Sequence, residues 1–222
     1  MQLVLTTELL LEAYRQGLFP MAYGAGSPYV HWMCPEKRGQ LSITHLHIPR
    51  RLKSTVFKHP YEVTINKDFR GVINGCAEKR ETRPETWIND QIMQAYIGLH
   101  DDGHAHSVEC WKDGVLVGGI YGLAIGKAFF GESMFSKARD ASKIALVHLT
   151  ARLWHGGFTI FDTQFVNDHL KQFGIYEIPH KDYMKVLRPT VKLHADFLQP
   201  SATEAELVHD YFEMRNSRPL LS

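Results

Sequence analysis

Apolar side chains recur at helical spacing in several separate segments of this chain. The first stripe predicts a short helix in residues 6–17, with Thr7 as its N-cap and Gly17 at its end. Its apolar face consists of Leu9, Leu10, Ala13 and Tyr14. The same spacing predicts further helices over residues 68–77, 89–100, 141–154 and 167–173. The main part of the chain begins with residues 41–48. Residues 49–53 then predict the start of one more short helix, which is basic.

Alternating and continuous apolar runs predict strands between these helices. Asp113-Gly114 is a strong hairpin signal and joins two runs into a meander whose third strand starts at residues 127–130. The strands predicted around it cover residues 61–65, 105–111 and 115–124. The short run over residues 158–161 is typical of a buried central strand. Prolines and glycines break regular structure over residues 19–28, and the tail after residue 182 shows no clear pattern.

The order of these elements predicts an α+β fold with a mixed sheet. A three-stranded meander followed by helix, buried strand and helix suggests a sheet whose late strands splay apart. That arrangement is typical of acetyltransferase-like (GNAT-like) domains, which bind an acyl donor at the splay. A connection through Pro35 favours a division into a small N-terminal domain, residues 1–36, and a larger domain, residues 37–222.

Composition fits a soluble globular protein and excludes several other classes. Of the 222 residues, 44% are hydrophobic and 22% are charged, so the chain can bury a core. No apolar run approaches the roughly 18 residues of a membrane-spanning helix, and the first residues lack the features of a signal peptide. We therefore expect a cytoplasmic protein without membrane contact. The chain contains 25 basic and 24 acidic residues, so it is nearly neutral overall. Any nucleic-acid contact must therefore come from a local basic patch.

The sequence predicts neither a bound metal nor a cofactor. The cysteines are Cys34, Cys76 and Cys110. Their number is odd and they form no CxxC pair, so we expect reduced thiols rather than disulfides or a zinc site. His104 and His106 can share one face of a strand, as can His45 and His47, but neither pair has the further ligands that zinc requires. No glycine-rich nucleotide-binding motif is present.

Polar residues directly follow the run predicted as a buried strand. On an extended segment Asp162 and Gln164 point the same way, at the edge where open sheets build sites. Asp162 could accept from the Gln164 amide NH2 and leave the amide carbonyl for a substrate amine. A helix cap followed by a turn is the alternative interpretation.

A buried acid and a basic stretch are the other candidates. Glu132 lies in an aromatic-rich run, where an ionised carboxylate needs a cation or several donors, unless it simply points to water at a strand end. The basic stretch consists of Arg50, Arg51, Lys53 and Lys58, with Lys37 and Arg38 upstream. It could bind phosphates or form an ordinary solvated face.

A series of short strings occurs along the chain in a characteristic order. It begins with the run Glu12-Ala13-Tyr14-Arg15-Gln16-Gly17-Leu18-Phe19-Pro20. It continues through residues 75–77, 86–89, 103–109, 116–122, 130–136, 141–143 and 162–164. Each string alone is unspecific, whereas their common order is very specific. This order resembles the leucyl/phenylalanyl-tRNA–protein transferase family, and the resemblance covers roughly residues 8–185.

The resemblance implies an activity and a fold. Members of this family transfer Leu or Phe, and less well Met, from aminoacyl-tRNA to the N-terminal Arg or Lys of proteins, which marks those proteins for degradation. Their fold combines a small N-terminal domain with an acetyltransferase-like domain. The ester bond of aminoacyl-tRNA is already activated, so the reaction needs no further cofactor.

The resemblance also suggests roles for particular residues. Asp162 would orient Gln164, whose carbonyl directs the attacking amine, and Glu132 would bind a cation of the acceptor. The donor side chain would lie against Trp87 and Phe129, with Met21 and Leu149 nearby. The segment that matches the family's tRNA-binding helix holds Arg50, Arg51, Lys53 and Lys58.

Departures from the family pattern leave questions open. Met21 stands where many members have Trp, which puts the donor preference in doubt, and His180 stands where Arg is common. The N-terminal segment is also shorter than in many members. Two other functions remain: an acetyltransferase that uses acyl-CoA, and a module that binds the tRNA acceptor end without catalysis. Nothing resembles a coiled coil, so a monomer is the default.

Overall fold

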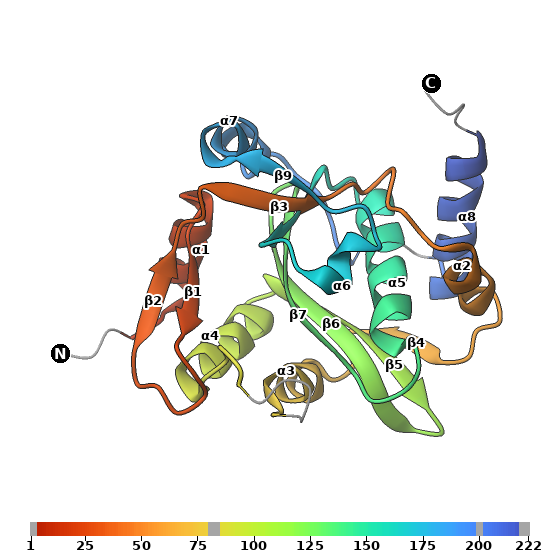
Figure 1. The fold of residues 1–222 in the computed structure, drawn as a ribbon, viewed down its shortest axis with the longest axis horizontal. Coiled ribbons are helices and arrows are strands. Elements are labelled where there is room, and N and C mark those ends of the chain that lie inside the picture. The colour runs from red at the N-terminus through yellow and green to blue at the C-terminus, as the bar shows by residue number, and fades with distance from the viewer. Residues whose placement is uncertain (1–3, 80–84, 199–201, 218–222) are drawn as a thin grey trace.

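A mixed seven-stranded sheet forms the centre of the molecule, and helices cover both of its faces (Figure 1). The computed structural model describes residues 4–79, 85–198 and 202–217. The strands lie in the order β4-β5-β6-β7-β8-β3-β9. β7 and β8 run parallel, whereas the other neighbouring strands are antiparallel. The strands are β3 (Lys37–Leu41), β4 (Glu62–Ile65), β5 (Ala105–Lys112), β6 (Val115–Ile125), β7 (Ala128–Ser136), β8 (Ile160–Gln164) and β9 (Tyr176–Pro179).

Two hydrophobic cores lie on opposite faces of this sheet. Because side chains alternate along a strand, Phe130 and Ile160 belong to one core, while their neighbours Phe129 and Phe161 belong to the other. The first core packs against α1 (Thr7–Arg15), α3 (Phe69–Ala77), α4 (Asp90–Asp101) and α7 (His180–Thr190). The second packs against α2 (Arg50–Val56), α5 (Ala141–His155), α6 (Asp168–Lys171) and α8 (Glu204–Ser217). Apart from Asp162, the paired residues of β7 and β8 therefore carry apolar side chains on both faces of the sheet, where the two cores enclose them.

Short polar side chains begin several of the helices. The Asp68 carboxylate accepts from the backbone N–H of Gly71 at the start of α3, and Asn89 caps α4 in the same way. At α1 the cap is Thr6, one residue before the predicted start. These helices lie where the apolar spacing predicted them.

Several segments differ from the expectation, and strands β3 and β9 were not predicted. Residues 19–22 and 30–33 form a small separate hairpin of β1 (Phe19–Ala22) and β2 (Val30–Met33), although proline and glycine predicted a break. The strand predicted at residues 158–161 lies at Ile160–Gln164, so Asp162 and Gln164 are part of it. The tail after residue 182 contains most of α7 and all of α8. In α8 the buried residues have ordinary helical spacing: Leu207, Val208, Tyr211 and Phe212.

The fold is α+β with a mixed sheet, as the sequence predicted, and a small N-terminal domain precedes the main sheet. In Figure 1 α1, β1 and β2 lie together beside the large sheet. The boundary predicted after residue 36 stays a prediction. No helix in the described ranges is long and apolar enough to cross a membrane.

The central parallel pair is short, and its strands then separate. β7 and β8 pair at three positions, and the last of these joins Phe130 to Asp162. Beyond this point β7 continues through residues 131–136 without β8 as a neighbour. A separation of two strands inside a sheet opens space between them at the level of Glu132 and Thr163.

Two bulges lie at this separation. Between β6 and β7, Tyr121 pairs with Ser133 and Gly122 with Gly131, so Glu132 is the extra residue. Between β3 and β8 the register also shifts, and Gln164 at this point has a positive φ of 61°. Bulges rotate side chains out of the regular alternation. Both of these bring polar side chains to the gap between β7 and β8.

The first bulge leaves no space for a side chain at Gly122. An added Cβ would overlap the Phe130 carbonyl oxygen and the Phe129 ring. We expect Gly122→Ala to lower the free energy of unfolding by about 1–3 kcal/mol, because overpacking forces the backbone to shift. Urea unfolding measures the change. Gly26→Ala is the matched control, since a Cβ there meets nothing within 4 Å; equal stability of the two variants would contradict the prediction.

Candidate functional site

A cavity of about 460 Å³ opens where β7 and β8 separate. Its walls come from the continuing part of β7, from the start of α5, from α6 and from Trp87, which precedes α4. The apolar lining includes Leu41, Trp87, Ile120, Met134, Leu146 and Phe161. Glu132, Ser133 and Thr163 add polar groups. The cavity thus combines an apolar wall with a carboxylate.

The cavity contains some of the predicted binding residues and excludes others. Glu132 and Trp87 line it, as the sequence suggested. Phe129 does not, because its side chain packs in the second core and stacks on Phe197. Leu149 is buried in the core around α5, and Leu146, one turn earlier, lines the cavity instead. Met21 packs against the other core, so Phe129, Leu149 and Met21 do not line this cavity, and their contact with the donor side chain stays a prediction.

Glu132 has one satisfied oxygen and one unsatisfied oxygen. Its Oε1 accepts from the Tyr14 hydroxyl at 2.7 Å and from the Gln164 side-chain amide at 2.8 Å. Tyr14 is in turn hydrogen-bonded to Tyr96. Its Oε2 is shielded from solvent and has no partner among the described residues. Burial raises the pKa of Glu132 to about 7, although the hydrogen bonds from Tyr14 and Gln164 oppose this.

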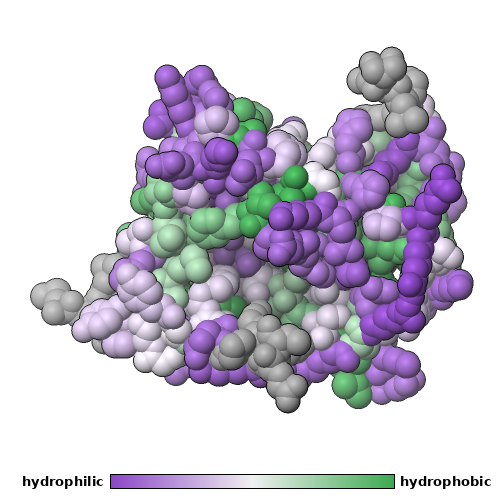
Figure 2. Space-filling model, in the orientation of Figure 1, coloured by the Kyte–Doolittle hydropathy of each residue, from purple (hydrophilic) through white to green (hydrophobic). Residues whose placement is uncertain are grey.

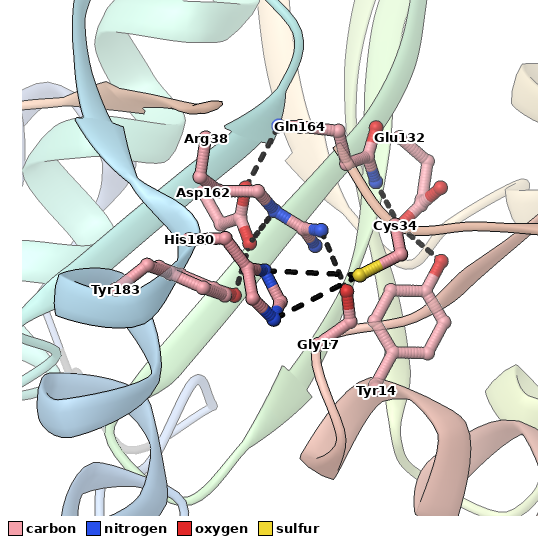
Figure 3. A network of polar contacts seen from close by, with 9 residues as sticks. All are labelled: Tyr14, Gly17, Cys34, Arg38, Glu132, Asp162, Gln164, His180 and Tyr183. Atoms are coloured by element: carbon pink, nitrogen blue, oxygen red, sulfur yellow. Dashed lines mark hydrogen bonds and ion pairs between the residues drawn. The ribbon is translucent and has the colours of Figure 1, made fainter. Parts of the chain in front are cut away.

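The link between Asp162 and Gln164 differs from the predicted one. Asp162 accepts from the backbone N–H of Gln164 at 2.7 Å and not from its side-chain NH2, which donates to Glu132. The bulge is the physical reason, because it breaks the alternation that would have turned both side chains the same way. Figure 3 shows Gln164 reaching toward Glu132, with Asp162 beside Arg38. Asp162 therefore fixes the backbone of Gln164, and Glu132 fixes its amide.

Arg38 is a buried cation, which corrects its assignment to the surface basic stretch. Neither its side chain nor that of Asp162 is exposed. Arg38 Nε lies 3.0 and 2.9 Å from the two Asp162 carboxylate oxygens, and Nη1 donates to the Gly17 carbonyl at 2.8 Å. The guanidinium carbon lies 4.8 Å from the ring centroids of both Phe19 and Tyr183. Tyr183 also donates its hydroxyl proton to Asp162.

The sequence alone does not distinguish Arg38 from its neighbour Lys37. Its strand, β3, lies between β8 and β9, and four of its five residues are buried. The neighbouring Lys37 is exposed, so the two adjacent cations have opposite environments. A basic pair alone cannot show this difference, because it depends on a partner that is 124 positions away. The polar contacts of Tyr14, Tyr96 and Tyr183 were not predicted either, because their partners also lie far away along the chain.

A second candidate surface surrounds α2. Arg50, Arg51 and Lys58 are exposed, while the Lys53 ammonium lies 4.8 Å from the Phe212 ring centroid. Two cations from the segment before α5 and its first turn join them: Arg139 and Lys143. We call these six residues the α2 patch. Figure 2 shows strongly hydrophilic side chains over α2.

Two shallow clefts in the α2 patch bring its cations together. One of about 420 Å³ lies between Arg51, Lys58 and Arg139. The other, of about 180 Å³, lies between Arg51, Arg139 and Lys143. Asp140 pairs with Lys143 at 3.2 Å and approaches Arg139 at 3.8 Å, so the patch is not uniformly positive.

The cysteines and histidines form no metal centre in the described ranges, where no group of three or more suitable ligands occurs. None of the three cysteines forms a disulfide, and Cys76 and Cys110 are buried, as predicted. Cys34 is exposed, and its Sγ lies 3.8 and 3.9 Å from the two ring nitrogens of His180.

Comparison with known proteins assigns this arrangement to one family. The model of the leucyl/phenylalanyl-tRNA protein transferase family matches residues 40–188, and the model of its N-terminal domain matches residues 4–36. A leucyl/phenylalanyl-tRNA–protein transferase of Rhodopseudomonas palustris (strain TIE-1) is 51% identical over 87% of this chain and 86% of its own length. One of Maricaulis maris is 50% identical over 86% of this chain and 88% of its own length.

The chain is an enzyme, a transferase that moves an aminoacyl group from tRNA to a protein. It belongs to the leucyl/phenylalanyl-tRNA–protein transferase family. The resemblance that the ordered sequence strings suggested is thereby confirmed.

The buried ion pair predicts a large effect on stability. Removing the cation in Arg38→Met leaves the Asp162 carboxylate buried and unpaired, so we expect a loss of about 3–5 kcal/mol in the free energy of unfolding at neutral pH. Adding Asp162→Asn should recover part of this loss, because the uncompensated charge disappears. Urea unfolding of the single and double variants measures both. The exposed pair Lys185–Asp182 is the control: Lys185→Ala should change stability by no more than about 0.5 kcal/mol.

Proposed function

We propose that this enzyme transfers Leu or Phe, and less well Met, from aminoacyl-tRNA to the N-terminal Arg or Lys of acceptor proteins, and so marks them for degradation. The observation that carries this proposal is the unsatisfied Glu132 oxygen in a cavity with apolar walls. An oxygen of this kind favours a cationic substrate group, which would neutralise the carboxylate. The apolar wall favours a hydrophobic donor side chain that is unbranched at Cβ.

Catalysis in this proposal depends mainly on placement. The aminoacyl ester is already activated, and an α-amine has a reference pKa of about 7.7–8.0, so a sizeable fraction is neutral at pH 7. Holding amine and ester together can contribute about 7–11 kcal/mol at best. The hydrogen bond from Gln164 to Glu132 fixes the amide, which leaves its carbonyl oxygen to accept from the acceptor N–H.

The donor side chain would occupy the apolar part of the cavity. Trp87, Leu146 and Phe161 lie on its walls and would contact Leu or Phe equally well. A β-branched side chain would be wider at Cβ, close to the ester that must react. Met21 lies outside this wall and packs against the first core.

The α2 patch would bind phosphates of the tRNA acceptor end. It includes the residues that the sequence suggested, namely Arg50, Arg51, Lys53 and Lys58. Arg139 and Lys143 extend it toward α5, whose residues Ser142 and Leu146 line the cavity. The same helix thus borders both surfaces, and a tRNA end bound on the patch would be near the cavity.

The proposal also covers the fold, the compartment and the oligomeric state of the enzyme. The separation of β7 and β8 beside an acyl-transfer site supports an acetyltransferase-like (GNAT-like) fold for residues 37–222, with residues 1–36 as a separate small domain. Because aminoacyl-tRNA is used by translation, we expect the enzyme in the cytoplasm. We expect a monomer, since no part of the sequence resembles a coiled coil.

The transfer assay tests this function against its alternatives. Purified enzyme is incubated with labelled Leu-tRNA and a peptide that begins with Arg, and in parallel with labelled acetyl-CoA. We expect the label to move to the peptide from Leu-tRNA alone, and a peptide that begins with Glu to remain unlabelled. Binding of tRNA without transfer would instead support a tRNA-binding module, and labelling from acetyl-CoA would support an acetyltransferase.

Charge reversal in the α2 patch tests the tRNA surface. We expect Arg51→Glu and Arg139→Glu each to weaken tRNA binding. Each phosphate that a variant no longer neutralises should reduce the slope of log affinity against log salt by about 0.7–0.9. Filter binding across a salt series gives the slopes. Lys192→Glu, an exposed reversal outside the patch, serves as control. Equal slopes for all three variants would show that the patch does not bind phosphate.

A further inference from the structure

The proposed transfer leaves one proton without a destination. When an α-ammonium nitrogen forms an amide bond it loses two protons, of which one leaves with the ribose oxygen. Gln164 is a poor acceptor for the other, because an amide is hardly basic. We propose that Glu132 is the general base that takes this proton, an inference that rests on the proposed function.

The geometry around Glu132 supports this role. Oε1 is held by Tyr14 and Gln164, so the orientation of the carboxylate is fixed by α1 and β8. Oε2 is buried and has no partner within the described residues, although the residue lines the cavity. A buried carboxylate oxygen without a donor needs either a proton or a substrate N–H. The ammonium of an acceptor provides both in turn.

Gln164 and Glu132 would work on the same amine. The Gln164 amide donates to Glu132 at 2.8 Å, and its carbonyl oxygen remains available to accept from the nitrogen. One group would therefore orient the amine while its neighbour takes the proton. This separates two tasks, positioning and proton transfer, that a single amide could not perform.

The proposed step balances in atoms and charge. The ammonium proton passes to Glu132, which becomes a neutral carboxylic acid, and the free amine attacks the ester carbonyl carbon. The new C–N bond forms as the bond from carbon to the ribose oxygen breaks. The second N–H proton goes to that oxygen and restores the ribose hydroxyl. Glu132 then returns its proton to solvent.

The ionisation of neighbouring groups agrees with this role. Burial brings the pKa of Glu132 to about 7, close to that of a free α-amine, so proton transfer between them needs little energy. Tyr14 and Tyr96 face it, and burial raises the pKa of both well above 10, so they remain neutral. Asp162 lies nearby on β8, and His169 of α6 borders the cavity. His169 is the histidine at the cavity within the described residues, and partial burial lowers its pKa.

Single-turnover kinetics at saturating acceptor test the inference. Because Glu132 must be ionised to accept a proton, we expect the wild-type rate to rise as pH increases through about 7 and then level off. Glu132→Gln should reduce this rate by about 10²–10⁴-fold and remove the step near pH 7. Residual activity should follow the ionisation of the acceptor amine at higher pH.

Further variants separate a base from a structural or binding residue. Glu132→Asp keeps a carboxylate and should retain a pH step near neutrality, whereas His169→Gln should leave that step in place. A rise in KM for the Arg peptide with an unchanged rate at saturation would reduce Glu132 to a binding group and overturn the inference, but not the proposed function. Loss of the step in His169→Gln would also overturn it. Failure of the wild-type enzyme to label any peptide would instead reject the proposed function.

Discussion

The ion pair between Arg38 and Asp162 is the constraint on which the rest of the site depends. Both side chains are fully buried, so neither charge is tolerable without the other. The Asp162 carboxylate also accepts from Tyr183 and from the Gln164 backbone, while Arg38 also donates to the Gly17 carbonyl. One pair therefore connects the end of α1, two strands of the main sheet and α7. The cost of burying it is offset by these additional bonds and by the two flanking aromatic rings.

Local irregularity of the sheet turns this rigid support into a site. A regular β7 would pair with β6 without an extra residue, and Glu132 would then follow the alternation of its neighbours. The bulge changes its direction, and the register shift near Gln164 does the same on β8. The resulting contact between carboxylate and amide crosses the gap where the parallel strands separate. The two bulges thus position the polar groups of the site, whereas the regular parts of the strands do not.

The sequence predicted what depends on local spacing. Helices such as α3 and α4, the meander and the apolar start of β8 follow from apolar periodicity and from caps such as Asp68. Ordered motif strings identified the family. The burial of Arg38 and the partner of the Gln164 amide could not be predicted, because they depend on residues more than 30 positions away and on bulges that alternation does not show. The proposed role of Phe129 came from the resemblance, which does not show that its ring packs in the second core.

The distances along the chain between the residues that hold Asp162 have a consequence for biosynthesis. Gly17, Arg38, Asp162 and Tyr183 must meet, and they span most of the polypeptide. Contacts of such large sequence separation form late, since they require closure of long loops. The environment of Asp162 therefore cannot be complete before Tyr183 has been synthesised, because the Tyr183 hydroxyl is one of the groups that hold the carboxylate.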